Sequence, residues 1–147
     1  MNYFIEVFGN DILFSGFIAW LIAQVLKIFT DFYKNRKMDV TRIVGSGGMP
    51  SSHSSLVMGL STAVGLKHGW GSDLYVISLI FSLIVMYDAS GVRRAVGKQA
   101  SLLNRIIKDL YKHKRILEGE LKELVGHTPK EVFAGAILGI IVANYYL

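Results

Sequence analysis

Two short histidine-containing stretches hold most of the reactive side chains of this chain. Residues 47–55 read Gly-Gly-Met-Pro-Ser-Ser-His-Ser-Ser and place His53 among four serines. Residues 126–131 read Gly-His-Thr-Pro-Lys-Glu and place His127 four residues before Glu131. Hydroxyl groups and the N–H groups of a helix N-terminus bind anions, and a neutral imidazole can act as a nucleophile or a general base. Both stretches therefore indicate phosphate chemistry.

Each stretch precedes an apolar segment, so each is predicted to lie where a helix begins. Ser51 and Ser52 would add hydroxyl donors beside His53. A helix that begins near Pro129 would bring Glu131 back toward the His127 ring in its first turn. Simpler interpretations stay open: a serine N-cap for the first stretch, and a Glu131 that only favours the helix N-terminus for the second.

The composition indicates a membrane protein with a single membrane-embedded domain, residues 1–147. Hydrophobic residues make up 52% of the chain and charged residues only 18%, which is too apolar for an ordinary soluble domain. Four apolar segments stand out: 12–29, 53–66, 74–92 and 132–147. A helix needs about 20 residues to cross the hydrocarbon core, so the first and third are long enough and the other two are marginal. The predicted fold class is all-α: a polytopic membrane helical bundle of about four membrane segments.

The distribution of Lys and Arg predicts the orientation of this bundle. The loops after the first and third segments are basic, whereas residues 1–10 contain no Lys or Arg. The positive-inside rule places both basic loops, and with them both histidine stretches, on the cytoplasmic side, and puts both termini outside. Residues 1–10 also lack the basic region of a cleaved signal peptide, so 12–29 is expected to be retained. The chain has no cysteine, which excludes disulfides.

The second basic loop is predicted to contain a cytoplasmic amphipathic helix. Its apolar residues recur at helical spacing, with basic residues between them. Such a helix could lie in the headgroup region, attracted by anionic lipid, or pack against the ends of the bundle with a solvated basic face. The apolar residues are Leu102, Leu103, Ile106, Ile107, Leu110 and Leu117, and the basic ones are Arg105, Lys108, Lys112, Lys114 and Arg115.

Four further charged residues are candidates for the site. Lys27 could bind phosphate or extend to the membrane interface. Asp88 is a carboxylate near the end of an apolar segment, which indicates function or an ion pair with Arg93 or Arg94. The two arginines could bind phosphate or act as positive-inside anchors. No short-spaced ligand pair predicts a metal site, and no signature predicts nucleic-acid binding.

At these residues the chain resembles the type 2 phosphatidic acid phosphatase superfamily, which includes acid phosphatases and vanadium-dependent haloperoxidases. It is most similar to a divergent membrane branch in which a Gly-Gly-Met-Pro-Ser-Ser-His string is typical. Residues 50–53 match the Pro-Ser-Gly-His motif, with Ser52 in place of glycine. His127 and Glu131 match the histidine and the acid of the third motif, with Glu in place of Asp. The branch resemblance extends from about Gln24 to the C-terminus.

The resemblance implies a metal-independent phosphatase that needs no cofactor. It implies that His127 is a nucleophile forming a phosphohistidine, that His53 is the general acid, and that Glu131 orients His127. Two family arginines have no counterpart, because Leu121 occupies one position and Lys34 the other. Arg93 and Arg94 could supply the missing guanidinium groups.

The leading hypothesis is hydrolysis of a lipid-linked phosphomonoester or pyrophosphate. Its expected partners are a phosphorylated lipid or isoprenoid substrate and anionic membrane lipids, which the basic loops would attract. The missing arginines favour the alternative, a non-catalytic lipid-phosphate binding or transport protein with a degenerate site. A purely structural membrane protein is the third hypothesis.

Overall fold

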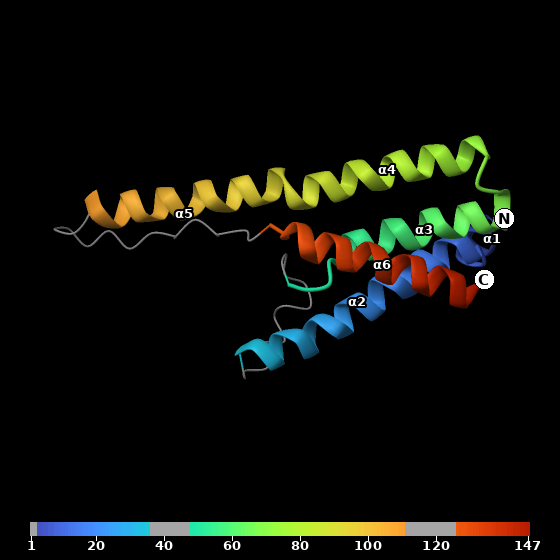
Figure 1. The fold of residues 1–147 in the computed structure, drawn as a ribbon, viewed down its shortest axis with the longest axis horizontal. Coiled ribbons are helices and arrows are strands. Elements are labelled where there is room, and N and C mark those ends of the chain that lie inside the picture. The colour runs from blue at the N-terminus through green and yellow to red at the C-terminus, as the bar shows by residue number, and fades with distance from the viewer. Residues whose placement is uncertain (1–2, 36–47, 111–125) are drawn as a thin grey trace.

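The computed structural model describes residues 3–35, 48–110 and 126–147, and all its regular structure is helical (Figure 1). The helices are α1 (Tyr3–Phe8), α2 (Asp11–Asn35), α3 (Ser52–His68), α4 (Asp73–Ser90), α5 (Val92–Leu110) and α6 (Pro129–Tyr146). The predicted apolar segments correspond to α2, α3, α4 and α6. The chain termini lie together at one end of the bundle (Figure 1).

Helix α3 is the centre of the bundle and packs against α2, α4 and α6. It is built largely from small and hydroxyl-bearing residues, which let the neighbouring backbones approach closely. Hydroxyl groups connect it to all three neighbours. Ser15 of α2 donates to the Gly59 carbonyl at 3.3 Å, Ser82 of α4 donates to the Val57 carbonyl at 2.9 Å, and Ser55 donates to the Gly135 carbonyl of α6 at 3.0 Å. Most of α3 is therefore covered by protein.

The contact between α3 and α6 depends on glycine. A Cβ atom added at Gly135 would collide with the Ser51 carbonyl oxygen, and one added at Gly139 would collide with the Ser55 carbonyl oxygen. Each collision is with backbone, which cannot turn aside as a side chain can. The two glycines thus fix the close approach that brings the first turns of α3 and α6 together.

In the described part of the chain, two stretches of helix are long and apolar enough to cross a membrane: Asp11–Tyr33 and Asp73–Lys108. They carry many exposed apolar side chains, among them Phe17 and Phe29 of α2 and Ile77 and Ile84 of α4. The predicted count of four membrane segments is not confirmed by this criterion, because neither α3 nor α6 meets it. The structure also adds α1, which the hydropathy pattern did not predict.

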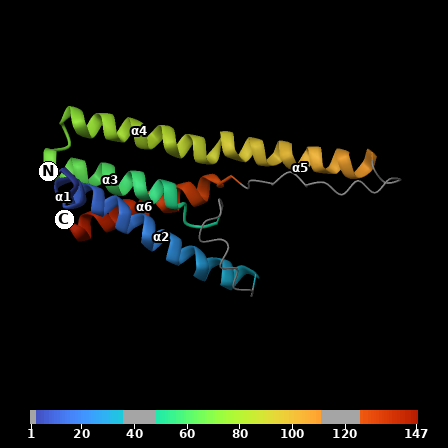
Figure 2. The same cartoon turned by 180° about the vertical axis from the view of Figure 1, so that it is seen from behind.

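Helices α4 and α5 form one almost continuous helix (Figures 1 and 2). The Gly91 N–H donates to the Tyr87 carbonyl at 2.8 Å, and the Ala95 N–H donates to the Gly91 carbonyl at 3.0 Å, so helical bonding continues through the junction. The 36-residue stretch is about 54 Å long at 1.5 Å per residue. A hydrocarbon core is about 30 Å thick, so this continuous helix is longer than one membrane crossing needs.

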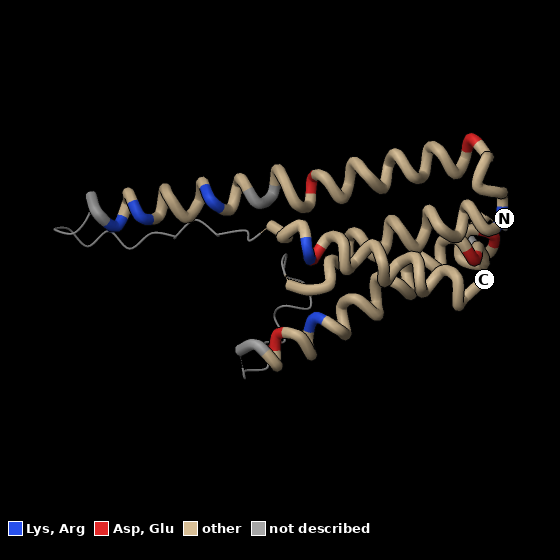
Figure 3. The backbone as a smooth tube through the Cα atoms, in the orientation of Figure 1, with Lys and Arg blue, Asp and Glu red and all other residues tan. Residues whose placement is uncertain are grey.

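The predicted amphipathic helix corresponds to α5. Among the described helices it packs only against α4. Figure 3 shows the basic residues coloured on α5 toward the end of the molecule away from both termini, with further basic positions on α2 and near the start of α6. This is the charge asymmetry expected from the sequence. The remaining residues assigned to this helix, Lys112, Lys114, Arg115 and Leu117, lie outside the described ranges.

Candidate functional site

The first turns of α3 and α6 meet at the end of the bundle away from the termini. Ser51 is the N-cap of α3, and its hydroxyl accepts from the Ser54 N–H at 3.4 Å. The Ser51 N–H donates to the Glu131 carbonyl at 2.9 Å, which ties this cap to the start of α6. The two histidine stretches, distant in the sequence, are therefore adjacent in the fold.

His127 is buried at this junction and held at both its backbone and its ring. Its backbone N–H donates to the Ala89 carbonyl of α4 at 3.1 Å, and its side chain is only 2% exposed. Ring atom Nδ1 lies 3.3 Å from Oε2 of Glu131. With its proton on Nδ1, the ring donates to the carboxylate and keeps a lone pair on Nε2.

Glu131 has two roles in the geometry at once. Its Oε2 atom accepts the Thr128 N–H at 2.9 Å, while the Thr128 hydroxyl accepts the Glu131 N–H at 3.4 Å. This reciprocal pair is a capping box at the start of α6. The same Oε2 atom faces the His127 ring. Helix capping and orientation of the imidazole are thus not alternatives here, because the cap holds the carboxylate where it meets the ring.

His53 lies in the first turn of α3, next to His127. The two ring centroids are 6.2 Å apart and the ring planes are inclined by 64°. His53 is exposed, whereas His127 is buried. Within the described ranges, Nε2 of His127 has no hydrogen-bond partner. A buried imidazole nitrogen beside a second imidazole is a suitable place for a group that interacts with both.

Lys27 brings a positive charge from α2 to the same place. Its side chain is 5% exposed, and Nζ donates to the Ser52 hydroxyl at 2.9 Å. The side chain is thus directed inward to α3. A buried ammonium beside a neutral hydroxyl has lost much of its hydration, so a bound anion would be favourable there.

Thr30 is a residue that the sequence analysis missed. Its hydroxyl lies 2.6 Å from the Met49 carbonyl oxygen and 3.0 Å from that of Lys27. These contacts attach the loop before α3 to α2, one turn after Lys27. The available signal was its i+3 spacing from Lys27, which places both residues on one face of the helix.

The surroundings of His127 keep its ring neutral. Burial lowers the pKa of His127, and the nearby positive charge of Lys27 lowers it further. The hydrogen bond and negative charge of Glu131 oppose this shift, as does the Gly48 carbonyl. The net effect is a pKa below the ordinary histidine value. A neutral imidazole near pH 7 is the form that can attack an electrophile.

The other predicted site residues lie around this group with different degrees of involvement. Ser52 contacts Lys27 directly, whereas Ser51 is fully buried and its hydroxyl serves the α3 cap. Asp88 is half-buried and precedes Ala89, the residue that accepts the His127 N–H. Arg93 and Arg94 lie in the first turn of α5, where the structure describes only their backbone. Leu121 lies outside the described ranges.

No group of three or more His, Cys, Asp or Glu residues suited to a metal ion occurs in residues 3–35, 48–110 and 126–147. The site is therefore described by its two imidazoles, one carboxylate and one ammonium group.

Comparison with known proteins gives two matches along most of the chain. The sequence model of the Divergent PAP2 family matches residues 8–142. The chain is 40% identical over 148 residues to a Bacillus subtilis (strain 168) protein named "Uncharacterized membrane protein YuiD", covering 93% of this chain and 94% of that protein. No solved structure matches.

Proposed function

This chain belongs to the Divergent PAP2 family, and we propose that it is a metal-independent membrane phosphatase that hydrolyses a lipid-linked phosphomonoester or pyrophosphate. The family resemblance expected from the sequence is confirmed, and the chain is a PAP2-related membrane protein. The catalytic activity and its phosphohistidine intermediate are the proposal.

One observation carries this proposal: Lys27, Ser52, His53 and His127 meet at one place. The buried Lys27 ammonium contacts Ser52, and the ring of His53, the next residue, lies 6.2 Å from that of His127. A phosphate bound there would compensate the lysine charge and be in reach of both imidazoles. The buried, unpartnered Nε2 atom of His127 would then face phosphorus.

The proposed reaction has two steps. In the first, the Nε2 lone pair of His127 attacks phosphorus, the bond from phosphorus to the leaving oxygen breaks, and His53 gives that oxygen a proton. Glu131 stabilises the positive charge that develops on the His127 ring. In the second step, water attacks the phosphohistidine with His53 accepting its proton. Inorganic phosphate leaves and neutral His127 is restored.

The site would lie at the cytoplasmic interface of a four-segment bundle with both termini outside. Basic residues gather at the end of the molecule that holds the site, as the positive-inside rule requires of a cytoplasmic end (Figure 3). The exposed basic residues of α5, Lys98, Arg105 and Lys108, would contact anionic lipid headgroups there. The substrate would be a phosphorylated lipid or isoprenoid whose chain stays in the bilayer.

Phosphate release by the purified protein in lipid–detergent micelles tests this function. The substrates are phosphatidic acid, phosphatidylglycerophosphate, and isoprenyl monophosphates and diphosphates. Release that is lost in both His127→Ala and His53→Ala, and retained in Tyr145→Ala, an exposed residue at the other end of α6, would support it. Release that persists unchanged in His127→Ala would refute the phosphohistidine step.

A second candidate is binding or transport of a lipid phosphate without cleavage. The observation that favours it is Leu121, which occupies a position where the superfamily has a phosphate-binding arginine. Under this candidate, vanadate or a lipid phosphate would bind in a manner that depends on His53 and His127, and no substrate would be hydrolysed.

A further inference from the structure

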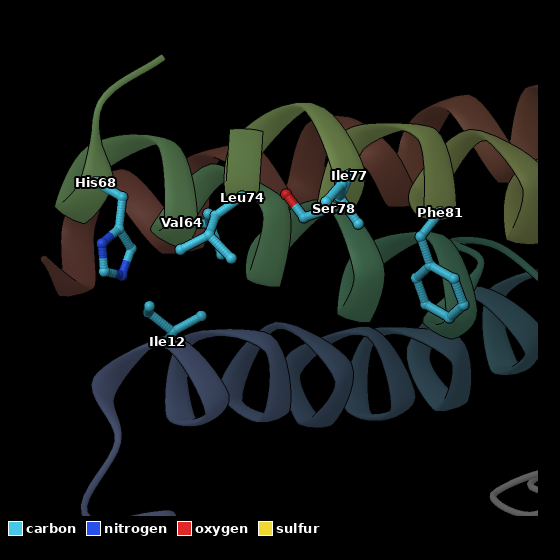
Figure 4. Close-up of a pocket in the computed structure, with 7 residues that line it drawn as sticks. All are labelled: Ile12, Val64, His68, Leu74, Ile77, Ser78 and Phe81. Carbon is cyan, nitrogen blue, oxygen red and sulfur yellow. The ribbon is translucent and has the colours of Figure 1, made fainter. Parts of the chain in front are cut away.

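A cavity of about 460 Å³ lies among α2, α3 and α4, at the other end of α3 from His53 (Figure 4). Its lining is almost entirely apolar, and the residues are Ile12, Val64, His68, Leu74, Ile77, Ser78 and Phe81. The one hydroxyl among them, that of Ser78, already lies 2.8 Å from the Tyr75 carbonyl and 3.2 Å from the Ser61 hydroxyl. The cavity therefore suits a hydrocarbon group.

The cavity opens between the two stretches that are able to cross a membrane. Helices α2 and α4 flank α3 and, in the described part of the chain, do not pack against each other. Ile12 comes from α2, while Ile77 and Phe81 come from α4 (Figure 4). In a bilayer this opening would face lipid chains, so a chain could enter from the side.

One face of α3 connects this cavity to the phosphate site. His53, Leu60 and Val64 are spaced by seven and four residues, so they lie on one stripe of the helix. His53 belongs to the phosphate site and Val64 lines the cavity. Leu60 between them is half-buried and packs beside Gly16 of α2. The stripe is apolar at Leu60 and Val64 and ends at His68, which also lines the cavity.

The distance between the phosphate site and the cavity sets a minimum length for the hydrocarbon chain of the ligand. Val64 is eleven residues after His53, a rise of about 16 Å along the helix, and His68 is fifteen residues after His53, a rise of about 22 Å. On α2, Lys27 and Ile12 are also fifteen residues apart. One leaflet of the hydrocarbon core is about 15 Å deep. A chain anchored by its phosphate must therefore be at least as long as one leaflet to enter the cavity.

We infer that the cavity among α2, α3 and α4 holds the far end of the hydrocarbon chain of the ligand whose phosphate binds at Lys27, Ser52, His53 and His127. This inference rests on the proposed phosphate site and adds to it a selectivity for long chains. An extended hexadecyl chain covers the distance to the cavity, whereas an octyl chain covers about half of it.

Alkyl phosphonates test the inference without turnover, because their carbon–phosphorus bond is not the bond that a phosphatase cleaves. Binding of octyl and hexadecyl phosphonate is measured to the full-length protein in one type of zwitterionic lipid–detergent micelle. Ile77→Trp fills the cavity from α4. Ile80→Trp is the matched control, because Ile80 is also an exposed residue of α4 but does not line the cavity. The binding of each phosphonate is compared between the wild type and the variants, so the partitioning of that phosphonate into the micelles cancels.

We expect Ile77→Trp to weaken hexadecyl phosphonate binding about threefold to tenfold, since packing contacts rather than water release hold the chain. Octyl phosphonate binding should not change, and Ile80→Trp should match the wild type with both probes. Hexadecyl binding that is unchanged in Ile77→Trp but lost in Lys27→Met would overturn the chain cavity and leave the phosphate site standing. Failure of the wild type to bind either probe would overturn both.

Discussion

Replacing Lys27 by Met separates the binding function of this lysine from its contribution to stability. The ammonium is 5% exposed and donates to the neutral Ser52 hydroxyl. A hydrogen bond to a charged group contributes roughly 1.5–3 kcal/mol, so loss of a Lys27–phosphate contact should weaken binding by roughly tenfold to 150-fold. Removal of the buried charge relieves its desolvation but also loses its attraction to the nearby Glu131 carboxylate, so the stability should change little. Met keeps most of the side-chain volume.

The assay measures hexadecyl phosphonate binding and thermal unfolding on the same preparations. Lys67→Met is the matched control, because Lys67 also joins α2 and α3, but at the other end of the bundle, where it pairs with Asp11. We expect weaker binding only in Lys27→Met. A folded Lys27→Met protein that binds the phosphonate as tightly as the wild type would refute the assignment of Lys27 to the phosphate site.

The same variant has a second, independent readout at His127. The positive charge of Lys27 lowers the pKa of His127, so its removal should raise that pKa. Histidine ring resonances followed by NMR across a pH titration would measure the change. An unchanged His127 titration would show that the two groups do not interact as the structure places them.

Three further predictions concern the histidine junction and the helix contact that forms it. Because the pKa of His127 is lowered, its ring should stay neutral at the ordinary histidine pKa of about 6.5, and phosphate release should decline only at pH values below that. As pH falls, His127 is protonated in the unfolded chain before it is protonated in the folded protein. The stability that neutral His127 contributes should therefore diminish as pH falls through about 6.5, and thermal melts of His127→Asn should not show this trend. Glu131→Gln keeps an oxygen for the Thr128 cap but loses the charge facing His127, and should lower the release rate roughly tenfold to 100-fold with little change in melting temperature. If Glu131→Gln also lowered the melting temperature strongly, the loss of rate would instead be assigned to the loss of the helix cap. Gly135→Ala should destabilise the protein by about 1–3 kcal/mol in thermal unfolding, because its Cβ meets the Ser51 carbonyl, whereas Gly71→Ala, with open space around it, should be near neutral.

The sequence by itself determined the local parts of this protein. Its apolar segments predicted four of the helices, and the basic residues with apolar spacing predicted α5. The spacing of His127 and Glu131 predicted a carboxylate close to the imidazole, because residues within one turn of a helix start are neighbours whatever the rest of the chain does. The Gly-Gly-Met-Pro-Ser-Ser-His string carried the family resemblance that the comparison confirmed.

Only the tertiary structure decided how these parts meet. Hydropathy reports that a helix avoids water, but it does not distinguish a helix covered by lipid from one covered by protein. Helix α3 is covered by α2, α4 and α6, and its marginal length and small, hydroxylated residues suit that position. The inward direction of Lys27, the adjacency of His53 and His127, and the cavity at the other end of α3 all follow from helix packing. The adjacency of the two histidines depends on close backbone contacts at Gly135 and Gly139, whose partners lie in another helix and cannot be read from spacing along one.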